Sequence, residues 1–105
     1  MILKSMASLK FNGEITLEEV FQQNKILIYD RVLLAIKKSY KELDIDETPI
    51  VQISINEVEY SIKLSKDKYL GALEGAISFY EKIEEYEKCQ QCLDIIKELK
   101  KMAHN

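Results

Sequence analysis

The sequence predicts a single α+β domain over residues 1–105, made of a long N-terminal helix, a one-sided two-stranded β-hairpin and a C-terminal helical hairpin. Apolar residues recur every three or four positions over 16–43 and 66–103, as on one face of a helix. Between these segments, apolar and polar residues alternate over 50–65, as in strands with one buried face. The 47% hydrophobic content suffices for one core.

Residues 1–15 give the weakest pattern. Leu9 and Phe11 alternate with polar neighbours just before an Asn-Gly turn, which favours a short extended segment at an edge of the fold. Ile2, Met6 and Leu9 would equally form a helical stripe, so both interpretations stay open.

The long helix over 16–43 has a strong start signal. Thr16 and Glu19 have the spacing of a capping box, and the residues around them fit a hydrophobic staple. An apolar stripe then continues through Ile26, Tyr29, Leu33, Ile36, Tyr40 and Leu43. Asn24, at the end of a polar stretch, could begin a second helix as its N-cap.

The hairpin over 50–65 follows an expected turn at 44–49, which ends at Pro49. A two-residue turn at Asn56-Glu57 would align apolar residues directly across the two strands. The resulting pairs are Ile55/Val58, Ile53/Tyr60 and Val51/Ile62. An isolated hairpin is barely stable in water, so we expect this apolar face to pack against the helices.

The last segment, 66–103, is expected to be two helices, with Ser65 as the first N-cap. Its first apolar stripe is Leu70, Leu73, Ile77 and Tyr80, and small residues beside it (Gly71, Ala72, Gly75 and Ala76) would let another element approach closely. This stripe loses phase at 83–85, which predicts a break there. One unbroken helix is the alternative, because Ala76, Phe79, Ile83 and Tyr86 form a continuous stripe.

Residues 85–101 read Glu-Tyr-Glu-Lys-Cys-Gln-Gln-Cys-Leu-Asp-Ile-Ile-Lys-Glu-Leu-Lys-Lys. With the preceding helix, over 73–101, they resemble the UVR motif, a short helical hairpin of excision-repair nuclease subunits and bacterial adaptor proteins. Tyr86 stands at the aromatic position of that motif, Cys89 at a small one and Asp94 at its aspartate. Leu93 departs from it, since the family usually has arginine there. The resemblance implies pairing with another helical hairpin, and thus protein–protein association.

Cys89 and Cys92 form the only sequence motif that could bind a metal ion or take part in thiol chemistry. A structural zinc site needs four ligands, and the chain offers this pair and the distant His104. We therefore expect buried, inert thiols, with no metal and no cofactor. The sequence also lacks a Gly-rich phosphate loop, a nucleophile elbow and a Ser-His-Asp set, so we expect no enzymatic activity.

Charge and hydropathy limit the classes of partner that we expect. The net charge is −3, the signs are mixed along the chain, and Arg31 is the only arginine, so we expect no nucleic-acid binding. The longest nearly uninterrupted apolar run, from Ile26 to Ile36, is broken by Asp30 and Arg31 and is too short to cross a bilayer, so we expect no membrane association. Two cysteines without a secretion signal favour a cytoplasmic location.

The function expected from these observations is a small non-enzymatic protein–protein interaction module. Its surface would be the C-terminal helical hairpin, at Tyr86, Cys89, Leu93 and Ile96. It would bind a protein partner or self-associate as a homodimer or larger assembly. The Lys- and Ile-rich composition suggests an AT-rich genome and fits a phage-type accessory protein or an inhibitor of a host factor or defence system.

Two other functions stay open from the sequence. One is a small-ligand or nucleotide-binding oligomer, with a site between subunits that uses polar groups such as Arg31 or Tyr40. The other is a thiol redox or metal protein that uses Cys89 and Cys92.

Overall fold

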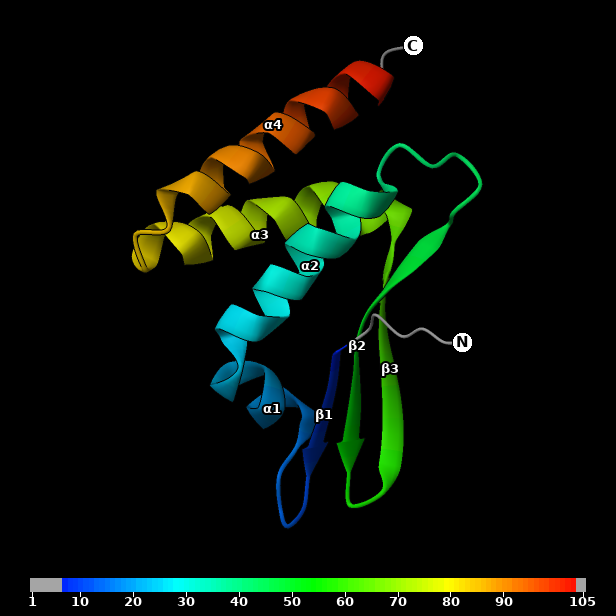
Figure 1. The fold of residues 1–105 in the computed structure, drawn as a ribbon, viewed down its shortest axis with the longest axis vertical. Coiled ribbons are helices and arrows are strands. Elements are labelled where there is room, and N and C mark those ends of the chain that lie inside the picture. Colours follow the sequence, from blue (N-terminus) through cyan, green and yellow to red (C-terminus); the bar gives the residue numbers. More distant parts are fainter. Residues whose placement is uncertain (1–6, 104–105) are drawn as a thin grey trace.

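The computed structural model describes residues 7–103. It confirms an α+β fold, in which helices cover one face of a small sheet and a helical hairpin packs on those helices (Figure 1). The elements in order are β1 (Ala7–Phe11), α1 (Leu17–Gln23), α2 (Lys25–Ser39), β2 (Glu47–Ile55), β3 (Val58–Ser65), a 3-10 turn η1 (Lys66–Lys68), α3 (Tyr69–Lys82) and α4 (Tyr86–Ala103).

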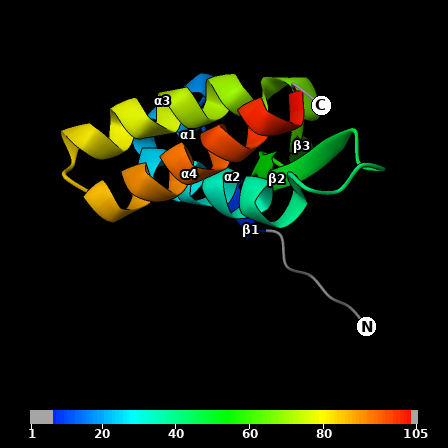
Figure 2. The ribbon, with the colours of Figure 1, turned by 90° about the horizontal axis from the view of Figure 1, so that it is seen from above.

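Helix α2 lies between two hydrophobic clusters and joins them. On one side, Ile28 and Ala35 pack with β2 around the fully buried Val51 and Ile53. On the other side, Leu33 and Ile36 pack against α3 and α4. Figure 2 shows α3 and α4 running side by side in opposite directions, with α2 next to them. The C-terminal hairpin is therefore held to the sheet through α2.

The sheet has three strands in the order β1-β2-β3, so the prediction of a two-stranded hairpin is wrong in strand number. The extended segment favoured at Leu9 and Phe11 is β1, an edge strand that runs parallel to β2. Parallel neighbours need a crossover connection, and the chain makes it with α1 and α2. Ile2 and Met6, which carried the helical alternative, lie outside the described residues.

The register of the β2–β3 hairpin is confirmed, with Ile55 opposite Val58 and Ile53 opposite Tyr60. Both turn residues have positive φ, 49° at Asn56 and 70° at Glu57. This is the geometry that suits the twist of a two-residue hairpin. The Asn56 side chain also accepts a hydrogen bond from the Gly13 amide and donates one to the Gly13 carbonyl, both 2.8 Å, which ties the hairpin to the turn after β1.

The predicted hairpin begins too late in the sequence. Strand β2 begins at Glu47, so the turn expected at 44–49 ends earlier and Pro49 lies inside the strand. The register shifts between Pro49 and Val51, and such a bulge is one of the places where a strand tolerates proline. The bulge also explains why two successive residues, Ile50 and Val51, are both buried.

The long helix expected over 16–43 is two helices. Its capping box is confirmed, since the Glu19 amide donates to Thr16 Oγ1 over 3.1 Å and the Thr16 amide donates to the Glu19 carboxylate over 2.8 Å. Asn24 separates α1 from α2, but its side chain donates to the Val20 carbonyl instead of capping α2. Helix α2 ends at Ser39, which leaves Leu43 outside the core and 81% exposed.

The C-terminal hairpin is broken at 83–85, as predicted, so the unbroken helix is wrong. Glu84 has φ 61°, its amide donates to the Glu81 carbonyl over 3.2 Å, and the Glu85 amide donates to the Tyr80 carbonyl over 2.9 Å. These two bonds make a Schellman motif, the usual way to satisfy the last carbonyls of a helix. The start differs from the prediction, because Ser65 makes no side-chain cap and α3 begins only at Tyr69.

The small residues of α3 fulfil their predicted role in part. Ala76 is fully buried and Ala72 packs against the same cluster, while a Cβ on Gly75 would lie 3.8 Å from Tyr29 Oη on α2. Gly71 has open space around it. The close approach therefore involves Ala72, Gly75 and Ala76, but not Gly71.

Replacing Glu84 by glycine is expected to stabilise the protein by about 1 kcal/mol, because a non-glycine residue in the left-handed region costs roughly that amount. Glu74→Gly is the matched control, since Glu74 is exposed in the interior of α3, away from this turn, and glycine there should cost about 1 kcal/mol. Urea unfolding of both variants measures the two effects. Equal destabilisation by both changes would contradict the assigned turn.

Candidate interaction surface

The structure separates the four predicted interaction residues of α4 into two pairs. Cys89 and Ile96 are only 7% and 8% exposed and belong to the cluster between α2, α3 and α4. Tyr86 and Leu93 are 62% and 43% exposed. Seven residues are about two helical turns, so Tyr86 and Leu93 lie on one side of α4. We call this pair the α4 outer stripe.

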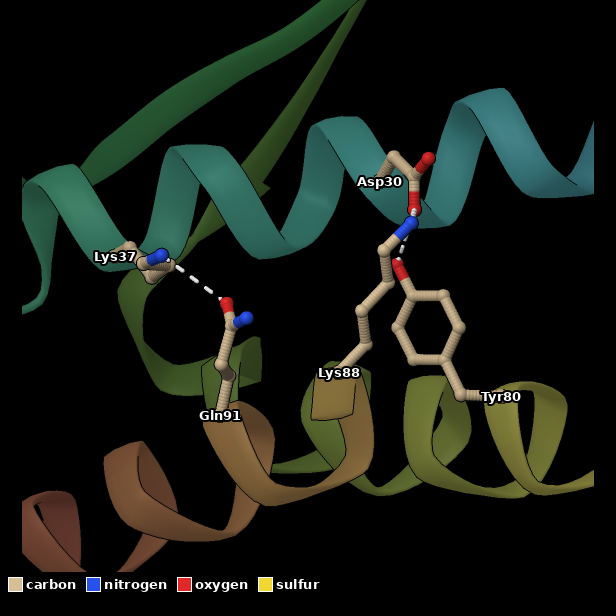
Figure 3. A network of polar contacts seen from close by, with 5 residues as sticks. All are labelled: Asp30, Lys37, Tyr80, Lys88 and Gln91. Atoms are coloured by element: carbon tan, nitrogen blue, oxygen red, sulfur yellow. Dashed lines mark hydrogen bonds and ion pairs between the residues drawn. The ribbon is translucent and has the colours of Figure 1, made fainter. Parts of the chain in front are cut away.

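A polar network fixes the position of the hairpin on α2 (Figure 3). Tyr80 Oη donates to Asp30 Oδ1 over 2.7 Å, and Lys88 Nζ lies 3.0 Å from the same oxygen. One turn further along α4, Lys37 Nζ donates to Gln91 Oε1 over 3.1 Å. These contacts hold α3 and α4 on α2, so the α4 outer stripe is presented on a fixed scaffold.

The sequence-based prediction missed this network because it considered Asp30 only as an interruption of the apolar run from Ile26 to Ile36. A carboxylate inside such a run is the signal that could have revealed it, since a half-buried charge usually has partners. Burial, with the hydrogen bond to Asp30 as a smaller cause, strongly raises the pKa of Tyr80, so the hydroxyl stays protonated as the donor.

The two cysteines are free thiols inside the core. Cys89 Sγ lies 3.7 Å from the Ile77 carbonyl, to which it donates. Burial, followed by the charge of Cys89, raises the pKa of Cys92 to about 11, and burial also raises the pKa of Cys89. A thiol must lose its proton to act as a nucleophile or metal ligand, so this environment opposes both roles at neutral pH.

The metal alternative finds no further ligands in the described chain. Across residues 7–103, no group of three or more His, Cys, Asp and Glu side chains is placed to hold a metal ion. His104 lies outside the described residues.

Stability is expected to fall at alkaline pH because of Cys92. Its pKa is raised from about 9 to about 11 on folding, so between these values the folded protein binds more protons than the unfolded chain. The contribution of the Cys92 thiol to the free energy of unfolding is therefore fully present below pH 9 and is lost as the pH rises towards 11. Urea unfolding under reducing conditions should show the advantage of wild type over Cys92→Ala shrinking by about 2 kcal/mol between about pH 8 and 10.5. A constant difference would contradict the buried thiol.

The ligand-binding alternative places its site between subunits, and the single chain has a depression between the end of α2 and α4. It has a volume of about 730 Å³ and includes Tyr40 among its lining residues, whereas Arg31 does not line it. The other lining residues are Lys41, Asp94, Ile95, Lys97, Glu98, Lys100 and Lys101. Charges of both signs surround it. Of the two residues named for this alternative, Tyr40 thus lies at this depression and Arg31 does not.

A second exposed apolar surface, which was not predicted from the sequence, lies on β3. Val58 and Tyr60 were expected against the helices, but they are 55% and 39% exposed. Their partners across the hairpin, Ile55 and Ile53, are buried. Beside this exposed strip, β3 and helices α1 and α2 enclose a groove of about 320 Å³, lined by apolar residues that include Phe21, Ile28, Val32, Ile50, Ile62 and Leu64.

No helix within residues 7–103 combines the length and the apolar character needed to cross a bilayer. Comparisons with protein-family models, with curated proteins and with solved structures found no match to this chain.

Proposed function

We propose that the chain is a small non-enzymatic protein–protein interaction module that binds a helical hairpin of another protein through the α4 outer stripe. The observation that carries this proposal is the exposure of Tyr86 and Leu93, 62% and 43%, on a helix whose remaining apolar residues are mostly buried. An inhibitor or accessory role of the phage type would act through the same contact.

The chemistry of the stripe suits a helical partner. Two apolar anchors separated by two helical turns match the spacing with which a helix inserts its apolar face between neighbouring side chains. Tyrosine is a frequent hot-spot residue, since it combines a large apolar ring with a polar end. Exposed polar residues, including Gln90 and Lys97, surround the anchors and would form the rim of the contact.

The UVR resemblance points to the same type of partner, since in that family the hairpin pairs with another helical hairpin. Tyr86 occupies the aromatic position of the motif and is here the more exposed anchor. Directly before Asp94, Leu93 replaces the arginine that is usual in the family, which makes the surface more apolar. We therefore expect a partner whose contact is largely apolar.

Affinity purification from a lysate of the source cells tests this function. The immobilised wild-type chain should retain a specific protein, and Leu93→Asp should lose it, because a carboxylate would be buried without a partner in the contact. Asn12→Asp is the matched control: it adds the same charge at an exposed polar position in the turn after β1, outside the proposed contact. We expect this control to retain the protein.

The proposal fails if Leu93→Asp retains the same proteins as wild type while remaining folded. It also fails if Asn12→Asp and Leu93→Asp lose the protein equally, since added charge alone would then explain the loss. Circular dichroism of each variant establishes that the fold is intact before the comparison.

A further inference from the structure

Strand β3 lies at an open edge of the sheet. Within residues 7–103 it pairs only with β2, and Figure 1 shows no other segment on its outer side along the half next to the Asn56-Glu57 turn. In a hairpin closed by a two-residue turn, the flanking residues Ile55 and Val58 form a hydrogen-bonded pair. The peptide groups of alternate residues then point away from β2. These outward residues are Glu59, Ser61 and Lys63.

The apolar face of β3 extends beyond its helical cover. Helices α1 and α2 pack on the buried residues of β2, while Val58 and Tyr60 remain largely exposed. An edge strand with unpaired peptide groups and exposed apolar side chains is a template for adding another strand.

The charges of β3 are arranged symmetrically. Glu59 and Lys63 lie two residues before and two residues after Ser61, and both are exposed. When two copies of β3 pair antiparallel about a two-fold axis at Ser61, Glu59 of each copy faces Lys63 of the other. On the helix-covered face, the same register places Tyr60 opposite Ile62 and Val58 opposite Leu64. Every directly opposed pair is then apolar, oppositely charged or serine with serine.

Other antiparallel registers of two β3 strands lack this match. Centring the pair on Glu59 places two glutamates together, and centring it on Lys63 places two lysines together. Directly opposed like charges destabilise a sheet. Centring it on Tyr60 or Ile62 leaves at least one of the two charges opposite Ser61. Of these registers, the one centred on Ser61 places both Glu59 and Lys63 opposite a residue of opposite charge in the other strand.

We infer that the occupant of this edge is a second copy of the chain, bound by antiparallel β3–β3 pairing about Ser61. The pairing extends the sheet to six strands and forms about six interchain backbone hydrogen bonds. A two-fold axis perpendicular to the sheet keeps the helices of both copies on one face. Val58 of the second copy then lies beside Leu64, at the wall of the 320 Å³ groove.

The existing contacts of the two charged residues do not block this arrangement. Glu59 accepts a hydrogen bond from Gln52, and Lys63 Nζ lies 3.7 Å from Glu47. The Lys63–Glu47 pair is about half exposed on both sides, so these side chains can turn towards a second strand at little cost.

A charge-swap experiment tests the dimer and its register. Sedimentation equilibrium should show a wild-type dimer. Glu59→Lys and Lys63→Glu should each weaken it at least about tenfold, because each creates two like-charged pairs. The double variant should restore the affinity to within about threefold, since it re-forms both opposite-charge pairs. An equimolar mixture of the two single variants should form a heterodimer.

Three results would overturn the inference: a monomeric wild type, single variants that dimerise as tightly as wild type, or a double variant as weak as the singles. Circular dichroism establishes that each variant is folded. Leu93→Asp separates this inference from the proposed function, because it lies on α4 and should leave the dimer intact. Loss of the dimer in Leu93→Asp would assign the interface to α4 and contradict β3 pairing.

Discussion

Ile96→Asp is expected to unfold the protein at room temperature, whereas Leu93→Asp is expected to remain folded. The two residues are three positions apart on α4 and are both apolar, but Ile96 is 8% exposed and Leu93 is 43% exposed. A carboxylate at position 96 would be buried in the cluster with Cys92 and Leu73, without a hydrogen-bonding partner. Burial of an unpaired charge, added to the lost apolar contacts, costs on the order of 5 kcal/mol or more.

Thermal unfolding followed by circular dichroism measures this contrast. Leu93→Asp should shift the midpoint by only a few degrees, since its cost is expected to stay below about 1 kcal/mol. Ile96→Val is the conservative control and should cost about 1 kcal/mol. If both aspartate variants unfold the protein, the division of α4 into a core side and an outer stripe is wrong.

Tyr80→Phe is expected to cost about 2 kcal/mol, while Tyr69→Phe should be neutral or stabilise the protein by up to about 1 kcal/mol. Both rings are buried, but their hydroxyl groups differ. The Tyr80 hydroxyl donates to the Asp30 carboxylate, and hydrogen bonds to charged groups are among the stronger ones. The Tyr69 hydroxyl has no hydrogen-bond partner among residues 7–103, so its removal relieves a desolvation cost.

Urea unfolding at neutral pH gives the two free energies, and the same substitution at two buried tyrosines makes each the control for the other. Asp30→Asn provides a further check, because it weakens the charge-assisted bonds from both Tyr80 and Lys88. Equal effects of the two phenylalanine substitutions would show that the Asp30 network does not hold the hairpin to α2.

Local signals account for the parts of the fold that the sequence predicted well. The capping box at Thr16 and Glu19, the register around Asn56-Glu57 and the break at 83–85 each depend on residues within a few positions of one another. The parallel pairing of β1 with β2 depends on a crossover through two helices, which no short pattern encodes. Pro49 misled the prediction because a bulge lets the strand accept it.

The candidate site was predictable only in part, for a geometric reason. Periodicity places Cys89, Leu93 and Ile96 on one broad apolar side of α4, but it does not say where α2 and α3 cover that side. The structure buries Cys89 and Ile96 and leaves Leu93 exposed. The exposed apolar strip of β3 was missed for the same reason, since the helices cover β2 but leave Val58 and Tyr60 uncovered.

The two proposed contacts lie on different parts of the molecule. Figure 1 shows α4 on the far side of α2 and α3 from the sheet, and β3 at the open edge of the sheet. Pairing through β3 therefore leaves both α4 outer stripes free in a dimer. Such a dimer would present two hairpins to its partner, and two linked contacts bind more tightly than one when the partner is also multivalent.

Photo-crosslinking from position 86 tests the central claim most directly. Tyr86 is replaced by a photo-reactive phenylalanine analogue, and the exposed Glu98 receives the same analogue as the control. Irradiation in lysate of the source cells is expected to join position 86 to one partner protein, and the Leu93→Asp change should abolish that product. If positions 86 and 98 give the same products, or position 86 gives none, α4 is not the interaction surface.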